Sequence, residues 1–538
     1  MTNPVAAEPE VVAFLDMGTN SIRLLIVRVA RDGAYRVLTE QKEVVRLGEG
    51  EFDTQQIQPP AMQRAINVCR RFNELASSYG ARRVVAVATS AAREATNQRQ
   101  FLRRLREEAG VSVRVVSGHE EARLIYHGVS SGIHLNDKRA LFVDIGGGST
   151  ELIVGDQRQI HYLSSLELGA IRLTSLHLPK PEQPVSQQDY RRLQLQVRNT
   201  AVYALQDIAD QPWSLAVGSS GTVENLAQIS ARMGKRSGSS SEEILLASQL
   251  RQVIEMLCSL PIDDRRRVPG INPERADIII GGAAIIETIM QELKIEELRV
   301  SKRGLRDGLL VDYLARTQQG QRLRDMSVRR RSVLQLAQSC GYDDHHAQHV
   351  AQLALELFDS ALEAGLHSLS TPERELLEYS AILHDIGSFV SYENQHAHTY
   401  YLIRNADLLG FDLREIGIMA TISLYHRKMA PRKKHPEFAA LDKEAQATVR
   451  TLSVFLRLAE SLDRGHAGNV LHARLRAVDA KRVTLSLTAF REPQLELWGI
   501  QSRQDALEST LKRRLGLEVI LTPDVTATEA GEPAPLAD

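Results

Sequence analysis

Cysteine, net charge and long apolar runs are all scarce in this chain, and each scarcity excludes a class of protein. The three cysteines, Cys69, Cys258 and Cys340, form no Cys-x-x-Cys pair, which argues against a disulfide framework or a thiolate zinc site. A formal net charge of −1 gives no global field that would steer the chain to nucleic acid or to a membrane. No apolar run reaches the roughly 18 residues of a membrane span, and the opening MTNPVAAEPE lacks the basic and apolar regions of a signal peptide. We therefore expect a soluble, cytoplasmic protein without nucleic-acid or membrane partners.

The chain has 538 residues, too many for one compact core, and its pattern changes along its length. From Val11 to about residue 315, apolar runs alternate with helical segments and predict an α/β fold; one run, Ala276–Ile280, is expected to be a buried strand. From 320 to 470, apolar spacings of three and four predict an all-α domain. Residues 471–522 contain strand-like runs, such as Leu495–Trp498, and predict a small α+β domain. The ends, 1–10 and 523–538, lack periodicity and are expected to be disordered.

Two segments of the α/β region repeat one pattern. The first reads FLDMGTNSIRL (14–24), the second reads FVDIGGGSTEL (142–152), and the two align without gaps. Asp16 corresponds to Asp144, and each aspartate follows an apolar run and precedes a glycine turn. Such a repeat predicts a duplicated domain with lobes at 11–130 and 131–315, each presenting its loop to a shared cleft.

The chemistry of these loops suits an anion. An apolar strand carries an aspartate to its end, and a glycine-rich turn then lets backbone N–H groups converge on a phosphate. The alternative is a pair of ordinary hairpins whose glycines only make turns. The consecutive glycines Gly146–Gly148 favour the phosphate site, because inside a sheet they cost backbone entropy that a plain turn does not require.

The repeat is broken at one informative position, where Arg23 corresponds to Glu151. A guanidinium holds phosphate oxygens as a fork. A carboxylate cannot do this, but Glu151 together with Asp144 is suited to a magnesium ion. The first loop is therefore expected to bind phosphate directly, and the second to bind phosphate together with metal.

A series of motifs resembles those of the exopolyphosphatase and guanosine pentaphosphate phosphohydrolase (Ppx/GppA) family. The motifs are DMGTNSIRL (16–24), ATSAAREA (88–95), SGHEEARLIYHGV (117–129), DIGGGSTEL (144–152), GSSGTVENLA (218–227), ERADIIIGGAAII (274–286) and SKRGLRDGLL (301–310). The two loops also resemble the phosphate motifs of the superfold of actin, heat-shock protein 70 and the sugar kinases. The resemblance implies two duplicated actin-like (ribonuclease H-like) α/β lobes. It also implies Mg²⁺- or Mn²⁺-dependent hydrolysis of the terminal phosphate of inorganic polyphosphate or of guanosine pentaphosphate, a homodimer and a role in the stringent response.

The same resemblance implies roles for single residues. Glu121, the second acid of SGHEE, falls where the family has its catalytic base, and its neighbour Glu120 is the alternative for that role. Asp144 and Glu151 fall on the magnesium-associated acids. The implied phosphate contacts are Thr19, Asn20, Ser21, Arg23, Arg93, Gly146, Gly147, Gly148, Ser149, Ser220 and Gly221, and the candidates for a substrate channel are Lys302, Arg303 and Arg306.

The helical region resembles an HD metal-dependent phosphohydrolase domain, named for a His-Asp pair, which here is His384-Asp385. The usual last ligand is an aspartate in a Leu-Ala-Asp context, and this chain departs from that pattern with Leu458-Ala459-Glu460. The implied ligands of a second divalent metal are His346, His384, Asp385, His398, His426, Glu460 and Asp463. Four further histidines are expected to be packed or surface residues: His345, His396, His435 and His466.

Three other functions are compatible with parts of the sequence. A kinase of the same superfold is disfavoured because SGHEEARLIY resembles the phosphohydrolase branch. A non-catalytic sensor of polyphosphate or guanosine tetraphosphate is disfavoured because Glu121, Asp144 and Glu151 are all present. The HD-like domain could carry a second phosphohydrolase activity of its own.

Overall fold

The computed structural model describes residues 10–29, 35–135, 138–178, 180–233, 244–316, 326–406, 408–427, 430–502 and 504–522. The chain forms two compact units, Met1–Val328 and Arg329–Asp538. The two ends expected to be disordered lie outside the described ranges, except that Glu10 already belongs to the first strand.

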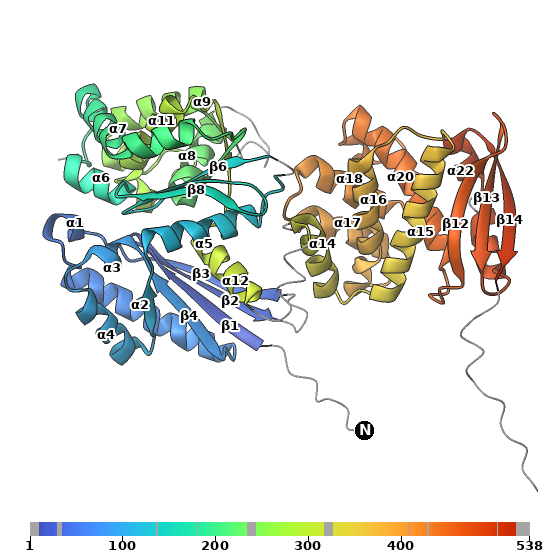
Figure 1. Ribbon diagram of the computed structural model, residues 1–538, viewed down its shortest axis with the longest axis horizontal. Coiled ribbons are helices and arrows are strands. Elements are labelled where there is room, and N and C mark those ends of the chain that lie inside the picture. Colours follow the sequence, from blue (N-terminus) through green and yellow to red (C-terminus); the bar gives the residue numbers. More distant parts are fainter. Residues whose placement is uncertain are drawn as a thin grey trace, which may run out of the picture. The chain divides into compact units, whose positions relative to one another are not determined.

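The first half of unit 1 is built on a five-stranded sheet with the strand order β3-β2-β1-β4-β5 (Figure 1). Its strands are β1 (Glu10–Met17), β2 (Ser21–Val29), β3 (Tyr35–Val44), β4 (Arg83–Ala88) and β5 (Val113–Val115). Its helices are α1 (Glu51–Thr54), α2 (Pro59–Ser78), α3 (Ser90–Glu94) and α4 (Gln98–Ala109). β1 is buried from Val11 to Met17, as expected for a central strand covered on both faces.

The second half of unit 1 is built on a six-stranded sheet with the order β10-β11-β9-β6-β7-β8. Its strands are β6 (Ala140–Ile145), β7 (Thr150–Gly155), β8 (Ile160–Leu166), β9 (Leu215–Ser219), β10 (Ile244–Leu246) and β11 (Glu297–Val300). Its helices are α6 (Ala170–His177), α7 (Gln187–Ala209), α8 (Ser220–Met233), α9 (Ala247–Ser259), α10 (Ile262–Arg265) and α11 (Ile279–Glu292), and η2 (Pro273–Arg275) is a short 3₁₀ turn.

The repeat seen in the sequence is also a repeat in register. β1 pairs antiparallel with β2 and places Asp16 opposite Arg23, and β6 pairs antiparallel with β7 and places Asp144 opposite Glu151. Each turn is closed by the same bond, in which a glycine N–H donates to a serine carbonyl: Gly18 to Ser21 (3.0 Å) and Gly146 to Ser149 (2.9 Å). The predicted fold class, two duplicated α/β lobes followed by a helical region and a small α+β piece, is confirmed.

Two helices, α5 (Gly118–Ser130) and α12 (Leu305–Ala315), lie between the two sheets (Figure 1). α5 packs on β7 and β8, α12 packs on β1 and β2, and the two helices pack on each other. Their backbones nearly touch, because a Cβ added at Gly308 would lie 1.8 Å from Leu124 O, and one added at Gly128 would lie 2.1 Å from Gly304 O. The contact between these helices therefore requires glycine.

Two expected strands take other forms. In the run Ala276–Ile280, residues 276–278 form a turn and Ile279 begins α11, a helix that is buried at almost every position. Gly281 and Gly282 do not end a strand; they let α11 approach its neighbours, since a Cβ on either would lie 2.4 Å from a threonine side chain. Leu495–Trp498 lies within helix α21 (Gln494–Gln501). A short apolar run alone does not separate a strand from a buried helix.

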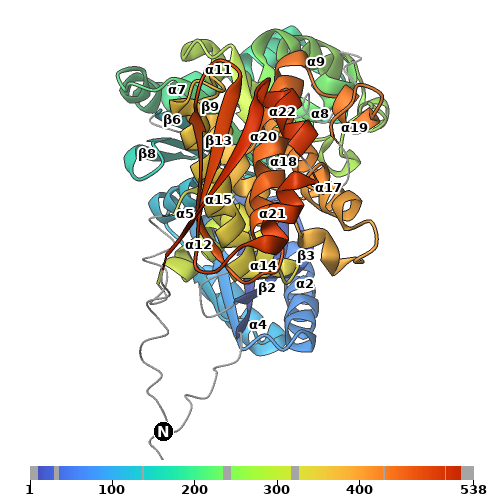
Figure 2. The same ribbon diagram turned by 90° about the vertical axis from the view of Figure 1, so that its right-hand side faces the viewer.

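Unit 2 begins with a group of helices and ends with a three-stranded sheet. The helices are α14 (Val328–Ser339), α15 (Asp344–Glu363), α16 (Thr371–Leu383), η3 (Ile386–Phe389, 3₁₀), α17 (Gln395–Asn405), α18 (Leu413–Leu424), α19 (Pro436–Ala439) and α20 (Lys443–Leu462). The sheet, β12 (Val470–Ala477), β13 (Arg482–Ala489) and β14 (Arg514–Leu521), lies beside α21 and α22 (Gln504–Leu511), which face the viewer in Figure 2.

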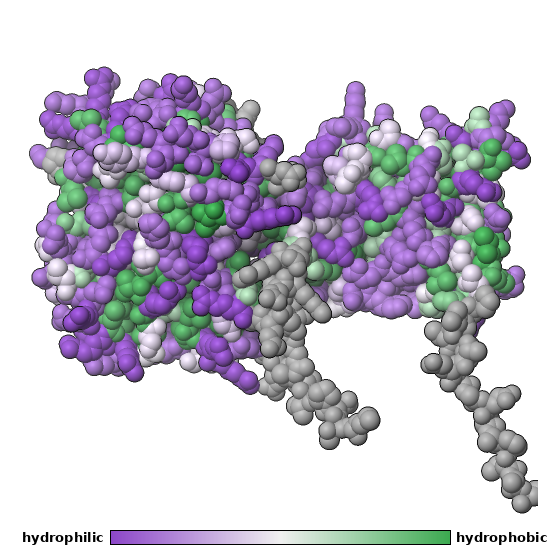
Figure 3. Space-filling model, viewed as in Figure 1, coloured by the Kyte–Doolittle hydropathy of each residue, from purple (hydrophilic) through white to green (hydrophobic). Residues whose placement is uncertain are grey.

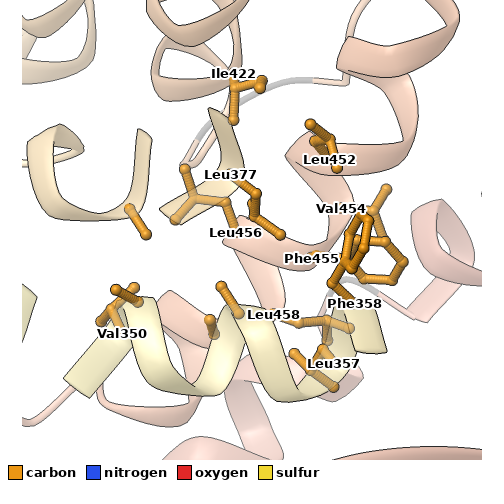
Figure 4. Close-up of a cluster of buried hydrophobic side chains, with 14 of the residues drawn as sticks. Val350, Leu357, Phe358, Leu377, Ile422, Leu452, Val454, Phe455, Leu456 and Leu458 are labelled. Atoms are coloured by element: carbon orange, nitrogen blue, oxygen red, sulfur yellow. The ribbon is translucent and has the colours of Figure 1, made fainter. Parts of the chain in front are cut away.

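A single hydrophobic cluster runs through the helices and the sheet of unit 2. Its helical part contains Val350, Leu357, Phe358, Leu377, Ile422, Leu452, Val454, Phe455, Leu456 and Leu458 (Figure 4). Val470, Leu475 and Leu485 extend it into the sheet. Each fully buried side chain of this size contributes about 1.5–3 kcal/mol of burial free energy, so the helices hold their positions through shared packing.

The surface is mostly hydrophilic on the face drawn in Figure 3, where hydrophobic residues form small, separate patches. Among the described residues, no helix has both the length and the apolar character needed to cross a bilayer.

The contact between α5 and α12 can be tested with Gly308→Ala. We expect a loss of about 3 kcal/mol or more in the unfolding free energy of unit 1, because the added methyl group meets backbone that cannot move aside. Hydrogen exchange of α5 and α12 peptides across a urea titration measures the loss. Gly80→Asn is the control, since nothing lies within 4 Å of a Cβ there and asparagine tolerates the φ of +75°. Equal stability of the two variants would contradict the packing described.

Candidate active site

The two Asp-Gly loops face each other across a cleft in unit 1. A Cβ added at Gly147 of the second loop would lie 2.9 Å from the Cβ of Thr19 in the first loop. A Cβ at Gly148 would lie 2.4 Å from Ser90 Oγ at the start of α3. The glycines are therefore needed for this close approach of the lobes, in addition to any contact with an anion.

Most of the predicted site residues line this cleft. These are Thr19, Asn20, Ser21, Arg23, Glu121, Asp144, Gly146, Gly147, Gly148, Ser149, Ser220 and Gly221, with Lys302 and Arg303 from the predicted channel. Arg93 and Glu151 do not line the cleft, but each is next to a residue that does. Arg93 bonds to Glu121, and Glu151 is paired with Asp144 across β6 and β7. Arg306 is turned away from the cleft lining and pairs with Glu40 at 3.0 Å.

Glu121 enters the cleft from the first turn of α5. Ser117 caps this helix by accepting a hydrogen bond from the N–H of Glu120, which fixes where the helix begins. Glu121 is buried, and Arg93 Nη1 donates to its Oε2 at 2.9 Å. Burial raises the pKa of Glu121 to about 7, against the opposing effect of Arg93.

Glu120 is placed differently from its neighbour. Its Oε2 accepts a hydrogen bond from Arg123 Nε at 2.8 Å, and this bond lowers the pKa of Glu120. Its side chain does not line the cleft. Of the two acids left open by the sequence, Glu121 is the one whose carboxylate reaches the loops.

Three further carboxylates are buried at the ends of the central strands. Ser219 Oγ donates to Asp144 Oδ2 at 2.5 Å, and Ser165 Oγ donates to Glu151 Oε1 at 2.9 Å. Burial raises the pKa of Asp16 to about 6 and also raises the pKa of Asp144 and, still more, of Glu151. Asp16 Oδ1 and Glu151 Oε2 are buried without a hydrogen-bond partner. Such oxygens are stabilised by a proton or by a cation.

These acids fit a hard divalent cation. Asp144 and Glu151 stand on the same rung of the β6–β7 ladder and offer oxygen, the donor that Mg²⁺ prefers. Within the described residues, the cleft has no group of three acids whose oxygens all lie within 4.8 Å of one another. An ion here would therefore complete its shell with water and ligand oxygens, as Mg²⁺ commonly does.

Basic side chains also gather at the cleft, and two of them were missed by sequence reasoning. Arg275, 8% exposed, lines the cleft, and its Nη2 lies 2.3 Å from where a Cβ of Gly221 would be. Burial, with Arg23 nearby, lowers the pKa of Arg275 to about 10. Lys42 faces Arg23 across β2–β3, and burial lowers the pKa of Lys42 to about 8, with Arg23 and Arg275 acting in the same direction.

Arg23, Lys42 and Arg275 repel one another, and the carboxylate of Glu224, which also lines the cleft, partly offsets this repulsion. A bound anion would offset it further. A partial signal for Arg275 was present, because this residue belongs to the motif ERADIIIGGAAII. Lys42 belongs to no motif, and its position follows from the pairing of β3 with β2.

Ser220 is held in an unusual conformation at the end of β9. Its φ is 84°, a region that residues other than glycine rarely adopt, and its Oγ donates to Ile145 O at 2.6 Å. The bond ties the start of α8 to the second Asp-Gly loop. Backbone strain of this kind is commonly held at ligand sites.

A second group of predicted residues comes together in unit 2. His346, His384, Asp385 and Glu460 line one cavity, and His426 Nε2 lies 3.5 Å from Asp385 Oδ1. Asp463 bonds to the back of His346. His398 does not join the group: α17 turns Gln395 and Thr399 inward, and His398 is partly exposed on another face. His466, expected to be a packed or surface residue, is exposed but stacks on His346 with ring centroids 3.6 Å apart.

Known families and structures resemble this chain along most of its length. A model of the Ppx/GppA phosphatase family matches residues 25–317, and a model of Ppx/GppA phosphatase domain III matches residues 328–504. An exopolyphosphatase from Cytophaga hutchinsonii is 26% identical with a TM-score of 0.53, covering 58% of this chain and 99% of its own. An exopolyphosphatase-like protein is 28% identical with a TM-score of 0.52, covering 57% and 98%. A Ppx/GppA member from Aquifex aeolicus is 26% identical with a TM-score of 0.48, covering 57% and 99%.

The buried state of Glu121 predicts a pH-dependent gain in stability for Glu121→Gln. The pKa of Glu121 rises on folding from an ordinary 4.5 to about 7, so this group lowers the stability of the fold progressively as pH rises from about 4.5 to about 7, and the loss stays constant above that range. Glutamine avoids that cost, and we expect the variant to be more stable at pH 8 by on the order of 1–3 kcal/mol, with a much smaller gain at pH 5.

Urea unfolding at the two pH values measures this effect. Glu120→Gln is the matched control, because the pKa of Glu120 is lowered on folding and its variant gains no stability at pH 8. A difference between Glu121→Gln and the parent that stays constant from pH 5 to pH 8 would rule out the buried, raised state of Glu121.

Proposed function

Since the chain belongs to the Ppx/GppA phosphatase family, we propose that its cleft hydrolyses the terminal phosphoanhydride bond of inorganic polyphosphate. Guanosine pentaphosphate is the second substrate of this proposal, because loss of its 5′-terminal phosphate is the same reaction. The observation that carries the proposal is a buried carboxylate, Glu121, with a pKa raised to about 7 beside two phosphate-type loops.

The proposed base is Glu121. A carboxylate whose pKa lies near the working pH is suited to remove a proton from water and to release it afterwards. Arg93 holds this carboxylate through its bond to Oε2, which aims the remaining oxygen at the attacking water. The water oxygen attacks the terminal phosphorus, the bond from phosphorus to the bridging oxygen breaks, and the shortened chain leaves with that oxygen.

Positioning of the terminal phosphate is assigned to the two loops. Phosphoryl transfer depends mainly on alignment and on neutralising charge. Backbone N–H groups of Gly147–Ser149 and side chains of Thr19 and Ser21 lie at the cleft wall, where they can donate to phosphate oxygens. Asp144 and Glu151 would hold Mg²⁺ or Mn²⁺, which when bound neutralises charge on the phosphate oxygens.

The basic side of the cleft supports a polyanion as substrate. Arg23, Arg275, Lys302 and Arg303 all line it, and Lys42 stands behind Arg23. One terminal phosphate does not require this number of cations, whereas a chain of phosphates carries charge along its length. A kinase function has less support than hydrolysis, because the cleft already contains a carboxylate suited to activate water.

Glu121→Gln should lower kcat for phosphate release from long-chain polyphosphate by about 10²–10⁴-fold, because the amide cannot accept the proton. KM should change little, since no phosphate contact is removed. Released phosphate is measured with Mg²⁺ for long-chain polyphosphate, guanosine pentaphosphate and ATP. The parent should also lose activity as pH falls below about 7, following protonation of Glu121. Glu120→Gln is the control and should retain near-parental kcat; a loss confined to Glu120→Gln would reverse the assignment.

Arg275→Gln should raise KM for polyphosphate by about 10–100-fold, the cost of losing one hydrogen bond to a charged group. Binding should also become less sensitive to salt, because one cation has been removed. Arg103→Gln on α4 makes the same charge change at an exposed position that does not line the cleft, and should leave KM unchanged. Equal effects of the two substitutions would indicate a general charge effect and would contradict a role for Arg275 in the cleft.

A further inference from the structure

The three carbonyl groups of the glycine loop 146–148 all accept hydrogen bonds from the start of α6. The bonds run from Ala170 N to Gly146 O at 3.0 Å, from Ile171 N to Gly147 O at 2.9 Å, and from Arg172 Nε to Gly148 O at 2.8 Å. The first two donors are backbone groups, whereas the third belongs to a side chain. The orientation of the peptide between Gly148 and Ser149 therefore depends on which residue stands at position 172.

The bonded carbonyls determine where the N–H groups of the loop point. In a planar trans peptide the C=O and N–H groups point in opposite directions. Carbonyls that face α6 therefore turn the N–H groups of Gly147, Gly148 and Ser149 to the other side, where these residues line the cleft. The N–H of Ser149 belongs to the peptide whose carbonyl Arg172 holds, so this side chain aims it at the cleft.

The start of α6 lies in direct contact with the loop. A Cβ added at Gly169, the residue before α6, would lie 2.3 Å from Gly147 O and 2.4 Å from Gly148 N. Backbone thus packs on backbone at this point, and the loop has no room to move toward the helix. A change in the loop would be a change in peptide orientation, which is what the bond from Arg172 controls.

The outer end of Arg172 is fixed to the first lobe, where α6 packs on α1 (Figure 1). Its Nη2 donates to Glu94 Oε2 and, at 3.4 Å, to Ser90 Oγ, and both of these residues belong to α3. Its guanidinium lies over the ring of Phe52, 4.2 Å from the centroid. The fork of a guanidinium lets one nitrogen hold a carbonyl while another holds a carboxylate. Arg172 thus ties the loop of the second lobe to α3 of the first.

The same helix holds the proposed base. Arg93 precedes Glu94 on α3 and donates to Glu121 Oε2 at 2.9 Å. Two adjacent residues therefore hold the two parts of the cleft: Arg93 holds the carboxylate, and Glu94 holds Arg172 and through it the phosphate loop. This short path fixes the base relative to the N–H groups that face it.

We propose that Arg172 is a positioning residue, which aims the N–H of Ser149 at the terminal phosphate and ties the loop to the helix that holds the base. It does not line the cleft, so it acts through the loop and not on the substrate. Only 12% of its side chain is exposed, and the packing around it limits its rotation. This inference rests on the proposed function, because the phosphate held by the loop is that of the proposed substrate.

Two substitutions of Arg172 separate positioning from ion pairing. Arg172→Met removes the bonds to Gly148 and to Glu94 together. Arg172→Gln places an amide nitrogen as many bonds from Cβ as the arginine Nε, so it can still donate to Gly148 O without reaching Glu94. We expect Arg172→Met to lower kcat for polyphosphate by about 10–100-fold with a smaller change in KM, because the loop is misaligned and the cations of the cleft remain. Arg172→Gln should recover most of this loss.

The affinity for inorganic phosphate gives a second measurement that requires no turnover. In isothermal titration calorimetry, phosphate should bind Arg172→Met about 10-fold more weakly than the parent, since one N–H donor to a charged group is turned away. Arg46→Met is the matched control. It also removes an ion pair between the lobes, from Arg46 Nη1 to Asp277 Oδ2 at 2.5 Å, but one that does not contact the glycine loop. It should retain the kcat and the phosphate affinity of the parent.

Equal losses in Arg172→Met and Arg172→Gln, or the same loss in Arg46→Met, would overturn the proposal, because ion pairing between the lobes would then account for them. So would an Arg172→Met variant that matches the parent. If Arg172→Met does not fold, Arg172→Met/Glu94→Gln takes its place, since it also removes the charge that Arg172 balances on Glu94. A parent that binds phosphate but does not hydrolyse polyphosphate would contradict the proposed function, and the phosphate affinities alone would then decide the role of Arg172.

Discussion

The burial of four carboxylates around one cleft is the constraint on which unit 1 depends. A buried carboxylate is costly unless it is paired, protonated or bound to a cation, and burial raises the pKa of Asp16, Glu121, Asp144 and Glu151 alike. Three of these acids are held by a side-chain hydrogen bond, from Arg93 to Glu121 and from a serine to Asp144 and to Glu151. The two sheets bring these groups together at their strand ends, and the cationic side of the cleft balances their charge.

Much of this arrangement could be predicted from the sequence, because it depends on local order. The repeat aligned Asp16 with Asp144 and Arg23 with Glu151, and the structure gives both copies the same register, because a turn of fixed length joins the paired strands in each. The resemblance supplied Glu121, and the first turn of α5 explains why it, and not Glu120, reaches the cleft. The features that were missed depend on tertiary contacts. Lys42 comes close to Arg23 only because β3 pairs with β2 in the sheet.

Two errors of prediction have equally specific causes. The apolar run at Ala276–Ile280 carries no periodicity, so its helical state follows from the length of α11 and from the way the helix is enclosed. His398 was expected among the metal ligands because of the resemblance to the HD domain. On α17 the inward position belongs to Thr399, which lies about 100° further around the helix and bonds to His384 O. Helix phase, which is set by where a helix begins, decides such cases.

The two units differ in the polar groups that they gather around a cavity. The cleft of unit 1 is lined by carboxylates and basic side chains, whereas the cavity of unit 2 is lined by imidazoles together with carboxylates.

The glycine contact between α5 and α12 sets the angle between the two helices. At Gly128 and Gly308 the helices touch through backbone, and apolar side chains of both helices belong to one cluster. Glu121 lies two turns from Gly128 on the same helix, a distance of about 10 Å. A tilt of about 5° at this contact would shift the carboxylate by about 1 Å, an error that can cost about 10²-fold in rate. The alignment of the acid with its water is thus governed by the angle between two helices at a point far from the chemistry.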